Sequence, residues 1–294
     1  MSRLSTLVSL LLLLAIPAFG QRPAFNNDST VFVNTVWNVD TLDGFILRQC
    51  HFMHRQVFNS NQCISIIEIP KGSKAHLAFA ADTVLTTTSA FAQRHHAAAA
   101  INGSYFNMST GAPVCYLRVA GRELGENTPS PQDSVNRKYY QNATIRLLSS
   151  GRPVFVIPDS SRRAEVQMKD SNIMTAGPML IHRGQVTPQR MDRRFVYARH
   201  NRTALGRRKD GTILLLVADG RCRGVAEGLS IPELTDVMRW LGCTEACNLD
   251  GGGSTTMYVE GRGEGGIVNH PSDNARFDAA GQRRVANAIL VVRE

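Results

Sequence analysis

Short runs of β-branched and aromatic residues divide the first hundred positions into predicted strands and turns. Apolar runs of this kind, bounded by Pro, Gly and Ser, are typical of strands. The segments that fit are 31–33, 63–69 and 76–80, with 70–72 as a turn, then a short helix over 86–95. The small apolar run 97–101 predicts a buried strand that ends at Asn102. The N-terminal third is therefore expected to be rich in β-structure.

The middle of the chain, about residues 112–200, has the pattern of a β meander. Residues 144–148 and 154–157 are strand-like and are separated by Ser, Gly and Pro. The polar stretch 125–138 contains two Pro and few apolar residues, which indicates a surface loop. Residues 174–181 then lead into another strand.

The C-terminal third carries the clearest pattern. Residues 212–218 are a continuous apolar run that ends at Asp219, as expected for a strand buried on both faces. A helix is predicted over about 231–241, because Ser230 has a Glu at capping-box spacing and the apolar residues recur on one helical face. The following strand delivers Asp250. If the two strands are parallel, both acids emerge at one sheet edge, where ligands usually bind.

Three glycines follow Asp250, and consecutive glycines need a structural reason because they cost conformational entropy. Free backbone N–H groups in a sharp turn form an anion-binding concavity. Gly251, Gly252 and Gly253 are therefore expected to cradle an anion, and the adjacent acid indicates acid–base chemistry on a charged substrate. The alternative is a tight turn in which Asp250 caps its own glycine N–H groups.

The first twenty residues have the pattern of a secretory signal peptide. Arg3 precedes an apolar run over 7–16, and residues 18–20 form a small-x-small cleavage site before Gln21. The apolar run is short for a bilayer span, and no later segment is long enough, although an uncleaved anchor is the alternative. We therefore expect a secreted or periplasmic protein without stable membrane insertion.

The chain is basic, and its charge comes mainly from arginine. The formal net charge is +9, and 28 of the 33 basic residues are Arg, whose planar fork matches phosphate and carboxylate groups. These residues are scattered along the chain. A nucleic-acid partner is not expected, because such proteins gather basic residues with aromatic platforms on one face. An anionic small molecule or glycan fits better.

Six cysteines permit three disulfides in an oxidising compartment. Proximity in sequence makes Cys50–Cys63 and Cys243–Cys247 the first pairs to expect. No Cys-x-x-Cys motif occurs and no His lies at the usual ligand spacing, so neither a metal site nor a cofactor is predicted.

Several blocks match, in order, a family pattern. They are Ala100–Phe106, Ala176–Pro178, Arg199–Gly206, Asp219–Arg221, Asn248–Met257, and Asn269–Asp273 with Arg283. On these blocks the chain resembles the phosphodiester glycosidase family over about residues 95–294. Residues 21–80 lie outside the resemblance. One departure is Ala226-Glu227-Gly228, where the family often has Ser-x-Gly.

The order of elements predicts an α+β (mixed α/β) fold with a central β-sheet and flanking helices. We expect three parts: the signal peptide (1–20), a β-rich N-terminal segment packed on the main domain (21–80), and a phosphodiester glycosidase-like domain (81–294). The resemblance implies hydrolysis of the bond between an anomeric carbon and a phosphodiester oxygen, for substrates of the GlcNAc-1-phosphate type. The products are a free sugar and a phosphomonoester.

The candidate catalytic residues are carboxylates and one imidazole. Asp250 is the first candidate, because glycoside hydrolysis needs a carboxylate to stabilise the anomeric centre or activate water. Asp219 is either a second carboxylate, a residue that orients an arginine, or a turn residue. Glu227 and His200 are further acid–base candidates.

The candidate binding residues surround these acids in the family blocks. Arg202 is expected to clamp the phosphate, since Arg binds two phosphate oxygens at once. Asn102 either bonds a sugar hydroxyl or simply forms a turn. Hydroxyl donors and further polar residues complete the set: Thr203, Ser254, Thr255, Arg221, Asn269, Asp273 and Arg283.

Two other functions compete with a glycosidase. One is a non-catalytic binder of anionic surface glycans, and the other is a phosphodiesterase that cleaves P–O. A metal requirement would favour the phosphodiesterase, because two-metal phosphoryl transfer is common.

Overall fold

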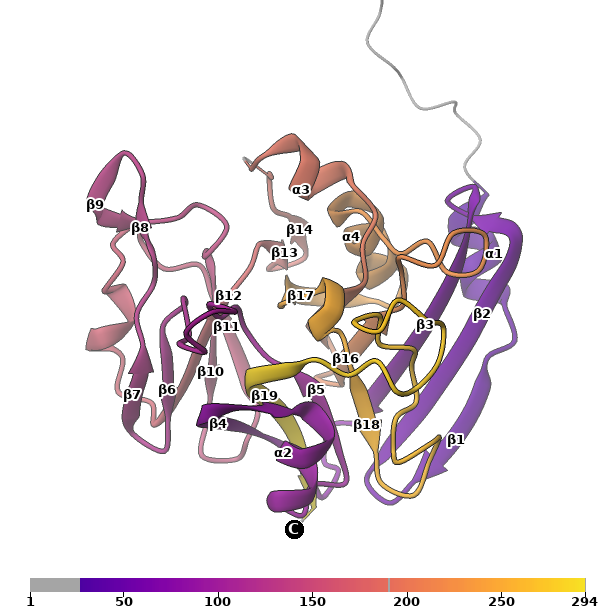
Figure 1. Ribbon diagram of the computed structural model, residues 1–294, viewed down its shortest axis with the longest axis horizontal. Coiled ribbons are helices and arrows are strands. Elements are labelled where there is room, and N and C mark those ends of the chain that lie inside the picture. The colour runs from indigo at the N-terminus through magenta and orange to yellow at the C-terminus, as the bar shows by residue number, and fades with distance from the viewer. Residues whose placement is uncertain (1–26, 190, 294) are drawn as a thin grey trace, which may run out of the picture.

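The computed structural model describes residues 27–189 and 191–293, which form a mostly β protein (Figure 1). The largest sheet has eight strands in the order β1-β2-β3-β16-β15-β17-β13-β14. A five-stranded sheet (β11-β10-β12-β6-β7), a four-stranded sheet (β18-β5-β19-β4) and the β8–β9 hairpin complete the strands. A central sheet is present as expected, but the helices are too few and short for an α+β description.

The elements have the following bounds. The strands are β1 (Asn38–Leu42), β2 (Phe45–Val57), β3 (Ser60–Ile69), β4 (Ala75–Thr87), β5 (Ala99–Asn102), β6 (Leu117–Val119), β7 (Arg122–Gly125), β8 (Pro129–Ser130), β9 (Asp133–Arg137), β10 (Ala143–Leu147), β11 (Pro153–Val156), β12 (Asn172–Ala176), β13 (Met179–His182), β14 (Gln185–Val186), β15 (Arg202–Arg208), β16 (Ile213–Ala218), β17 (Cys243–Asn248), β18 (Met257–Val259) and β19 (Arg284–Arg293). The helices are α1 (Asp28–Asn34), α2 (Thr88–Arg94), α3 (Arg193–Tyr197) and α4 (Ile231–Trp240), with 3-10 turns η1 (Ala164–Gln167) and η2 (Gly252–Ser254).

The strands β16 and β17 run in the same direction. Both pair with β15 in antiparallel ladders, and β15 lies between them. At one end of β15, Arg202 pairs with Ala218 and Ala204 pairs with Asn248. The chain therefore leaves β16 at Asp219, and it leaves β17 shortly before Asp250 at the same edge of the sheet. The two strands thus have the parallel orientation on which the prediction of a shared edge depended.

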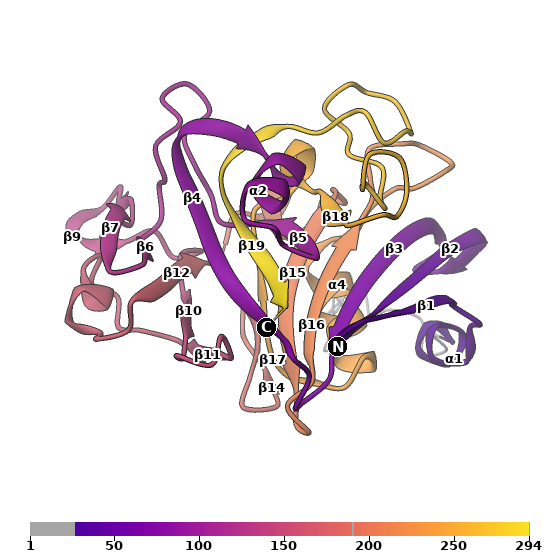
Figure 2. The ribbon, with the colours of Figure 1, turned by 90° about the horizontal axis from the view of Figure 1, so that it is seen from below.

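The helix α4 covers one face of the large sheet, as its apolar stripe predicts. Ser230 and Glu233 form the capping box, each bonding the other's backbone N–H. Leu234, Val237 and Met238 are fully buried in the core on this face, where α4 packs mainly against β17 and β13. The other face carries the four-stranded sheet, so α4 and β19 lie on opposite sides of β15 and β16 in Figure 2.

Two local predictions were wrong, and tertiary burial explains one of them. Residues 31–33 lie in α1, not in a strand, because α1 places the Phe32 ring among Trp37, Phe52 and Trp240 at centroid distances of 5.3–5.5 Å. The predicted loop 125–138 contains the β8–β9 hairpin.

The N-terminal strands belong to the same sheet as the C-terminal third. Six residue pairs join β3 to β16, from Ile69–Ile213 to Ile64–Ala218. The predicted boundary at residue 80 falls inside β4, which pairs along most of its length with β19. The signal-peptide prediction lies outside the described residues. Within them, we find no helix with the length and apolar character needed to cross a bilayer.

All six cysteines are free, so the two expected disulfides are absent. A register shift in β17 places Cys243 in the core under α4 and Cys247 in the core on the opposite face. In the β2–β3 ladder, Cys50 pairs with Ile64 and Cys63 pairs with His51. Adjacent positions along a strand point to opposite faces, so these two thiols also point apart.

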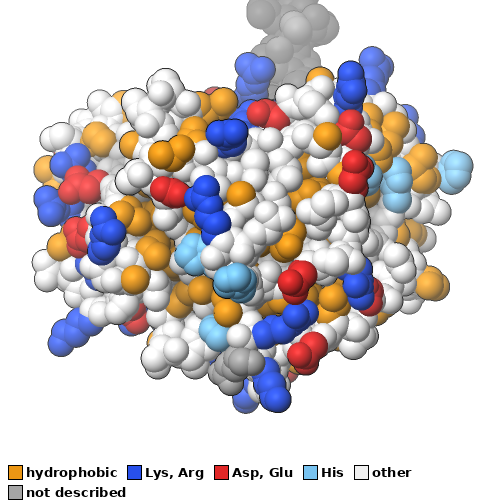
Figure 3. Space-filling view, turned by 60° about the horizontal axis from the view of Figure 1, so that its bottom comes forward, with side chains coloured by type: hydrophobic (Ala, Val, Ile, Leu, Met, Phe, Trp, Pro, Cys, Tyr) orange, Lys and Arg blue, Asp and Glu red, His pale blue; other side chains and the backbone are white. Residues whose placement is uncertain are grey.

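The basic side chains are dispersed on the surface. On the face in Figure 3, Lys and Arg occur singly, with acidic side chains among them. This distribution matches the expectation from the sequence and offers no continuous basic stripe on that face.

Candidate active site

Asp250 lies where the chain leaves β17, between the end of β5 and a glycine turn. Its backbone N–H donates to the Gly103 carbonyl (3.1 Å), and its own carbonyl accepts from the Asn102 side-chain amide (2.7 Å). One carboxylate oxygen accepts from the Gly251 N–H (2.9 Å). The contact with the Gly251 N–H is the local cap expected if Asp250 were only a turn residue. The contacts with Asn102 and Gly103 also hold Asp250 against the end of β5.

The carboxyl of Asp250 titrates close to neutral pH. Burial raises its pKa to about 6. The Ser254 hydroxyl, the Gly251 N–H, Arg283 and Arg221 each oppose this rise by favouring the charged form. A carboxyl with a pKa in this range, beside two arginines, is suited to exchange a proton at neutral pH.

The glycines after Asp250 are required by close packing. A Cβ at Gly251 would lie 2.7 Å from the Asn201 carbonyl oxygen. A Cβ at Gly252, whose φ is +60°, would lie 2.6 Å from Nη2 of Arg221. The Gly252 N–H donates to the same Asn201 carbonyl (2.9 Å). Two of the three glycine amides are thus already bonded within the protein, so the expected amide cradle is incomplete.

An ion pair lies directly over Gly253. Arg283 donates to Asp273 at 2.5 Å, and a Cβ at Gly253 would come within 2.4 Å of both side chains. These two residues were predicted at the rim, and their side chains are partly exposed. Arg221 and Arg283 both lie near Asp250, and Asp273 balances the charge of Arg283.

Arg202 lies deeper than a simple phosphate clamp requires. The residue is 3% exposed, and its Nε and Nη2 donate to the carbonyls of Leu229, Phe195 and Ala198 at 2.9–3.1 Å. Burial lowers its pKa to about 10. Its guanidinium also lies 5.1 Å from the Phe195 ring centroid. Most of its hydrogen-bonding capacity therefore fixes the segment before β15 and the loop before α4.

His200 lies among arginines. Burial lowers its pKa, and the positive charges of Arg202, Arg221 and Arg194 lower it further. The imidazole is therefore neutral at pH 7. The same field that keeps His200 uncharged favours an anionic ligand in its neighbourhood.

Three predicted binding residues are fully buried and support Asp250 from behind. The Thr203 hydroxyl donates to Oδ1 of Asn102 (2.8 Å) and to the Thr255 hydroxyl (3.3 Å). The Asn102 amide donates to the Asp250 carbonyl, and Oδ1 of Asn102 also accepts from the Thr256 N–H (3.2 Å). This network positions the catalytic candidate, and Asn102 is fully buried within it.

Asp219 is buried beside His270, which was not among the candidate site residues. One of its carboxylate oxygens accepts from the Asn269 amide (2.9 Å), and the other lies 2.8 Å from Nδ1 of His270. Burial and this carboxylate raise the pKa of the Cys63 thiol, so Cys63 is not an activated nucleophile. The Asn269–Asp273 block was the only sequence signal that could have indicated His270.

Glu227 is held by Arg199, at 3.4 Å from its Nη1. Arg199 bonds Glu233 more closely, at 2.6 Å. Both Glu227 and Arg221 line an open cavity of about 500 Å³, together with Arg55, Arg199, Cys222 and Arg223. Glu227 is thus the single acid in an arginine-rich cavity next to the glycine turn.

A chain of aromatic rings leads from the neighbourhood of Asp250 to a larger cavity. Tyr105, whose pKa is raised first by burial and then by Asp250, meets Tyr140 edge-on at 5.7 Å. Tyr140 stacks on Phe195 at 6.3 Å. Both Tyr140 and Phe195 line a cavity of about 950 Å³. This cavity is large enough for a drug-sized group.

Residues 95–292 match the sequence profile of the phosphodiester glycosidase family. The chain belongs to this family. Mouse N-acetylglucosamine-1-phosphodiester alpha-N-acetylglucosaminidase is 31% identical over 101 residues, which cover 34% of this chain and 18% of that relative. The chain therefore spans less than a fifth of the length of this curated relative.

Solved structures share the fold. The catalytic domain of zebrafish N-acetylglucosamine-1-phosphodiester alpha-N-acetylglucosaminidase, auto-inhibited by its pro-peptide, superposes with a TM-score of 0.64 at 16% identity. The match covers 88% of this chain and 89% of that one. A hypothetical protein from Synechocystis gives a TM-score of 0.60 at 16% identity, over 88% of this chain and 64% of the other. The shared fold thus extends beyond the segment that matches the phosphodiester glycosidase profile.

The matched segment contains Asp250, the glycine turn and the surrounding arginines. Several buried side-chain atoms there have no partner within the described residues: Ser104 Oγ, Asn201 Nδ2, Asn248 Oδ1 and Thr256 Oγ1. Buried polar groups are normally satisfied, so such a group of atoms indicates a place for water or a polar ligand.

Proposed function

We propose that this protein is a secreted hydrolase that cleaves the glycosidic C–O bond of a sugar-1-phosphodiester, of the GlcNAc-1-phosphate type. One observation carries the proposal: a carboxyl with a pKa of about 6 lies at the strand edge beside Arg221 and Arg283. This combination brings an acid–base group to an anion-binding position within a family of phosphodiester glycosidases.

The phosphate group is bound by charge in this proposal. Arg221 lies against Gly252 and Arg283 lies against Gly253. The positive charge of each favours the ionised form of Asp250. Arg202 adds its field from behind the site. Because Arg presents paired donors, two of these residues suffice to hold the non-bridging oxygens of a diester.

Asp250 acts on the sugar side. The bond between the anomeric carbon and the bridging oxygen breaks, and the electron pair leaves with the phosphomonoester. A phosphate is a weak base, so its departure needs little protonation. The ionised Asp250 stabilises positive charge at the anomeric carbon and accepts the proton of the attacking water. The unpartnered Asn201 amide supplies a hydrogen bond to a sugar hydroxyl.

The larger cavity accommodates the group beyond the phosphate. Its Tyr140 and Phe195 rings give it an apolar wall, and its volume of about 950 Å³ exceeds that of a single hexose. An aglycone with an aromatic or aliphatic portion therefore fits better than a second highly charged group.

Hydrolysis in ¹⁸O-labelled water tests the bond that is cleaved. Synthetic GlcNAc-1-phosphodiesters are the first substrates to try. Label on the sugar C1 hydroxyl supports C–O cleavage. Label in the phosphate identifies the competing phosphodiesterase reaction and overturns the proposal.

Secretion is tested separately by expressing the full chain with its first twenty residues. A mature N-terminus at Gln21 in the exported fraction supports the signal-peptide hypothesis. Retention of Met1 on an exported or membrane-bound product contradicts cleavage at that position.

A further inference from the structure

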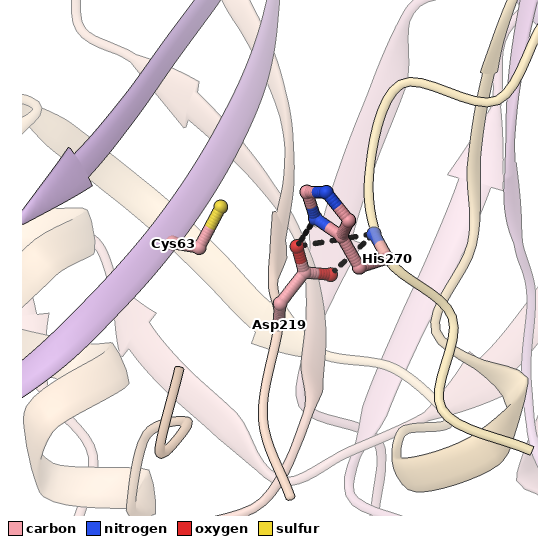
Figure 4. A group of neighbouring side chains, drawn as sticks. All are labelled: Cys63, Asp219 and His270. Carbon is pink, nitrogen blue, oxygen red and sulfur yellow. Dashed lines mark hydrogen bonds and ion pairs between the residues drawn. The ribbon is translucent and has the colours of Figure 1, made fainter. Parts of the chain in front are cut away.

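Three side chains with metal-binding atoms converge beside the candidate active site (Figure 4). They are the thiol of Cys63, the carboxylate of Asp219 and the imidazole of His270, and their ligand atoms all lie within 4.8 Å of one another. We propose that these residues bind one divalent transition-metal ion, with zinc as the preferred ion.

The three ligands come from three separate segments. Cys63 lies in β3, Asp219 follows β16, and His270 belongs to the loop before β19. Hydrogen bonds hold these segments together, because the Asp219 N–H donates to the Cys63 carbonyl (2.9 Å) and the His270 N–H donates to the Asp219 carboxylate (3.0 Å). Ligands so distant in sequence produce no spacing motif, which explains why the sequence predicts no metal.

The charge balance favours a cation at this point. Asp219 is 1% exposed, yet no Arg or Lys forms an ion pair with it within the described residues. Its hydrogen-bond donors are the Asn269 amide, the backbone and ring N–H groups of His270, and the Cys63 thiol. A buried carboxylate is costly without a compensating charge, and a bound divalent ion supplies that charge.

The donor set selects the class of ion. Sulfur, imidazole nitrogen and carboxylate oxygen together suit zinc, which binds them at about 2.0–2.3 Å in tetrahedral geometry. Binding would release the thiol proton of Cys63 to solvent and use the Nδ1 lone pair of a neutral His270 that carries its proton on Nε2. Calcium and magnesium prefer oxygen ligands alone and are therefore disfavoured.

The geometry requires only a small adjustment. Nδ1 of His270 lies 2.8 Å from the Asp219 carboxylate, which is closer than two ligand atoms of one ion should be. The sulfur of Cys63 lies within 4.8 Å of both atoms. Ligand atoms around a tetrahedral zinc ion are separated by roughly 3.3–3.8 Å. A rotation of the imidazole away from Asp219 would lengthen the distance between Nδ1 and the carboxylate toward that spacing.

The site is accessible from one side. The His270 side chain is 35% exposed and borders a cavity of about 530 Å³. The Phe277 ring stacks on the imidazole at 3.7 Å and holds its plane. With three protein ligands, the fourth position would face this opening and take a water molecule, as in zinc sites that keep an open position.

A cysteine-dependent catalytic triad does not explain the cluster. In such triads the imidazole lies between the nucleophile and the carboxylate, so that it can accept the nucleophile's proton. Here the Cys63 thiol hydrogen-bonds directly to the Asp219 carboxylate, which also contacts the His270 imidazole (Figure 4). A disulfide does not explain Cys63 either, because Cys50 points to the opposite face of the β2–β3 ladder.

The experiment measures metal binding without using turnover. The full chain is stripped with a chelator, titrated with ZnCl₂ by calorimetry, and analysed for bound metal after dialysis. We expect one zinc per chain, with affinity at least about 100-fold weaker in Cys63→Ser and His270→Ala. Cys50→Ser is the matched control, and it should bind as the unaltered protein does.

Cobalt substitution adds a spectroscopic measurement that separates loss of a ligand from misfolding of the variant. Bound Co²⁺ should give a thiolate-to-metal charge-transfer band in the unaltered protein, in His270→Ala only at much higher metal concentration, and not in Cys63→Ser. Absence of stoichiometric zinc in the unaltered protein overturns the proposal. Equal zinc affinity in folded Cys63→Ser overturns it as well, and failure of the glycosidase assay alone would affect neither result.

Discussion

Replacing Asp250 by Asn should make the protein more stable and less active at the same time. The substitution keeps an acceptor for the Gly251 N–H and removes the negative charge. Burial raises the pKa of Asp250 from 3.8 to about 6, so the folded protein binds this proton more tightly than the unfolded chain. The native state therefore loses stability as the pH rises from about 4 to 6, and above that range the full cost remains.

The size of the effect follows from the shift. At 1.36 kcal/mol per pKa unit, the ionised carboxyl costs about 3 kcal/mol of folding free energy at pH 7.5. For a chain of this size, Asp250→Asn should then raise the melting temperature by roughly 5–10 °C at pH 7.5. At pH 4 the native carboxyl is already protonated, and the gain should fall below about 1 kcal/mol.

Thermal unfolding at the two pH values is the assay, with turnover of a GlcNAc-1-phosphodiester measured on the same samples. The exposed Asp43→Asn is the control, and it should change neither quantity. Turnover should fall by about 10³-fold or more, because the proton acceptor is lost. A stability gain of the same size at pH 4 and pH 7.5, or undiminished turnover, would refute the assignment of Asp250 as a buried catalytic carboxylate.

Three further results are expected. The value of kcat/KM should rise with pH through about 6 and then level off, because Asp250 must be ionised to accept a proton; a rate that falls over this range contradicts that role. Arg221→Ala should weaken substrate binding by about 1.5–3 kcal/mol, measured as KM, whereas the neighbouring Arg223→Ala should have little effect. Gly253→Ala should lower the free energy of unfolding by about 1–3 kcal/mol in a denaturant titration, because its Cβ displaces the ion pair of Arg283. An unchanged free energy of unfolding would show that the loop moves to make room for the Cβ.

Local patterns predicted the elements on which the site is built. The run 212–218 and the Ser230 capping box correspond to β16 and α4, because each has a local cause that the rest of the protein reinforces. Strands β16 and β17 bring Asp219 and Asp250 to one edge of the sheet, as the strand–helix–strand pattern indicated. The placement of α1 depends on distant aromatic partners, so the local β propensity of residues 31–33 was misleading.

The side-chain environments could not be predicted in the same way. Arg202 matches the family block, but its burial depends on carbonyls of the loops around it. The faces of Cys243 and Cys247 depend on a single register shift in β17. The approach of His270 to Asp219 depends on how a long loop returns to the sheet, and no periodicity in the sequence records that return.

The pairing of β3 with β16 has a practical consequence for protein production. A fragment that starts at residue 95, where the family match begins, would lack β3 and leave the apolar strand β16 as a bare sheet edge. It would also lose the Asn61 side chain, whose amide tethers the loop after Asp219 through the Gly224 carbonyl (2.6 Å). Unpaired apolar edges recruit other chains, so such a fragment should aggregate, and expression should begin before β1.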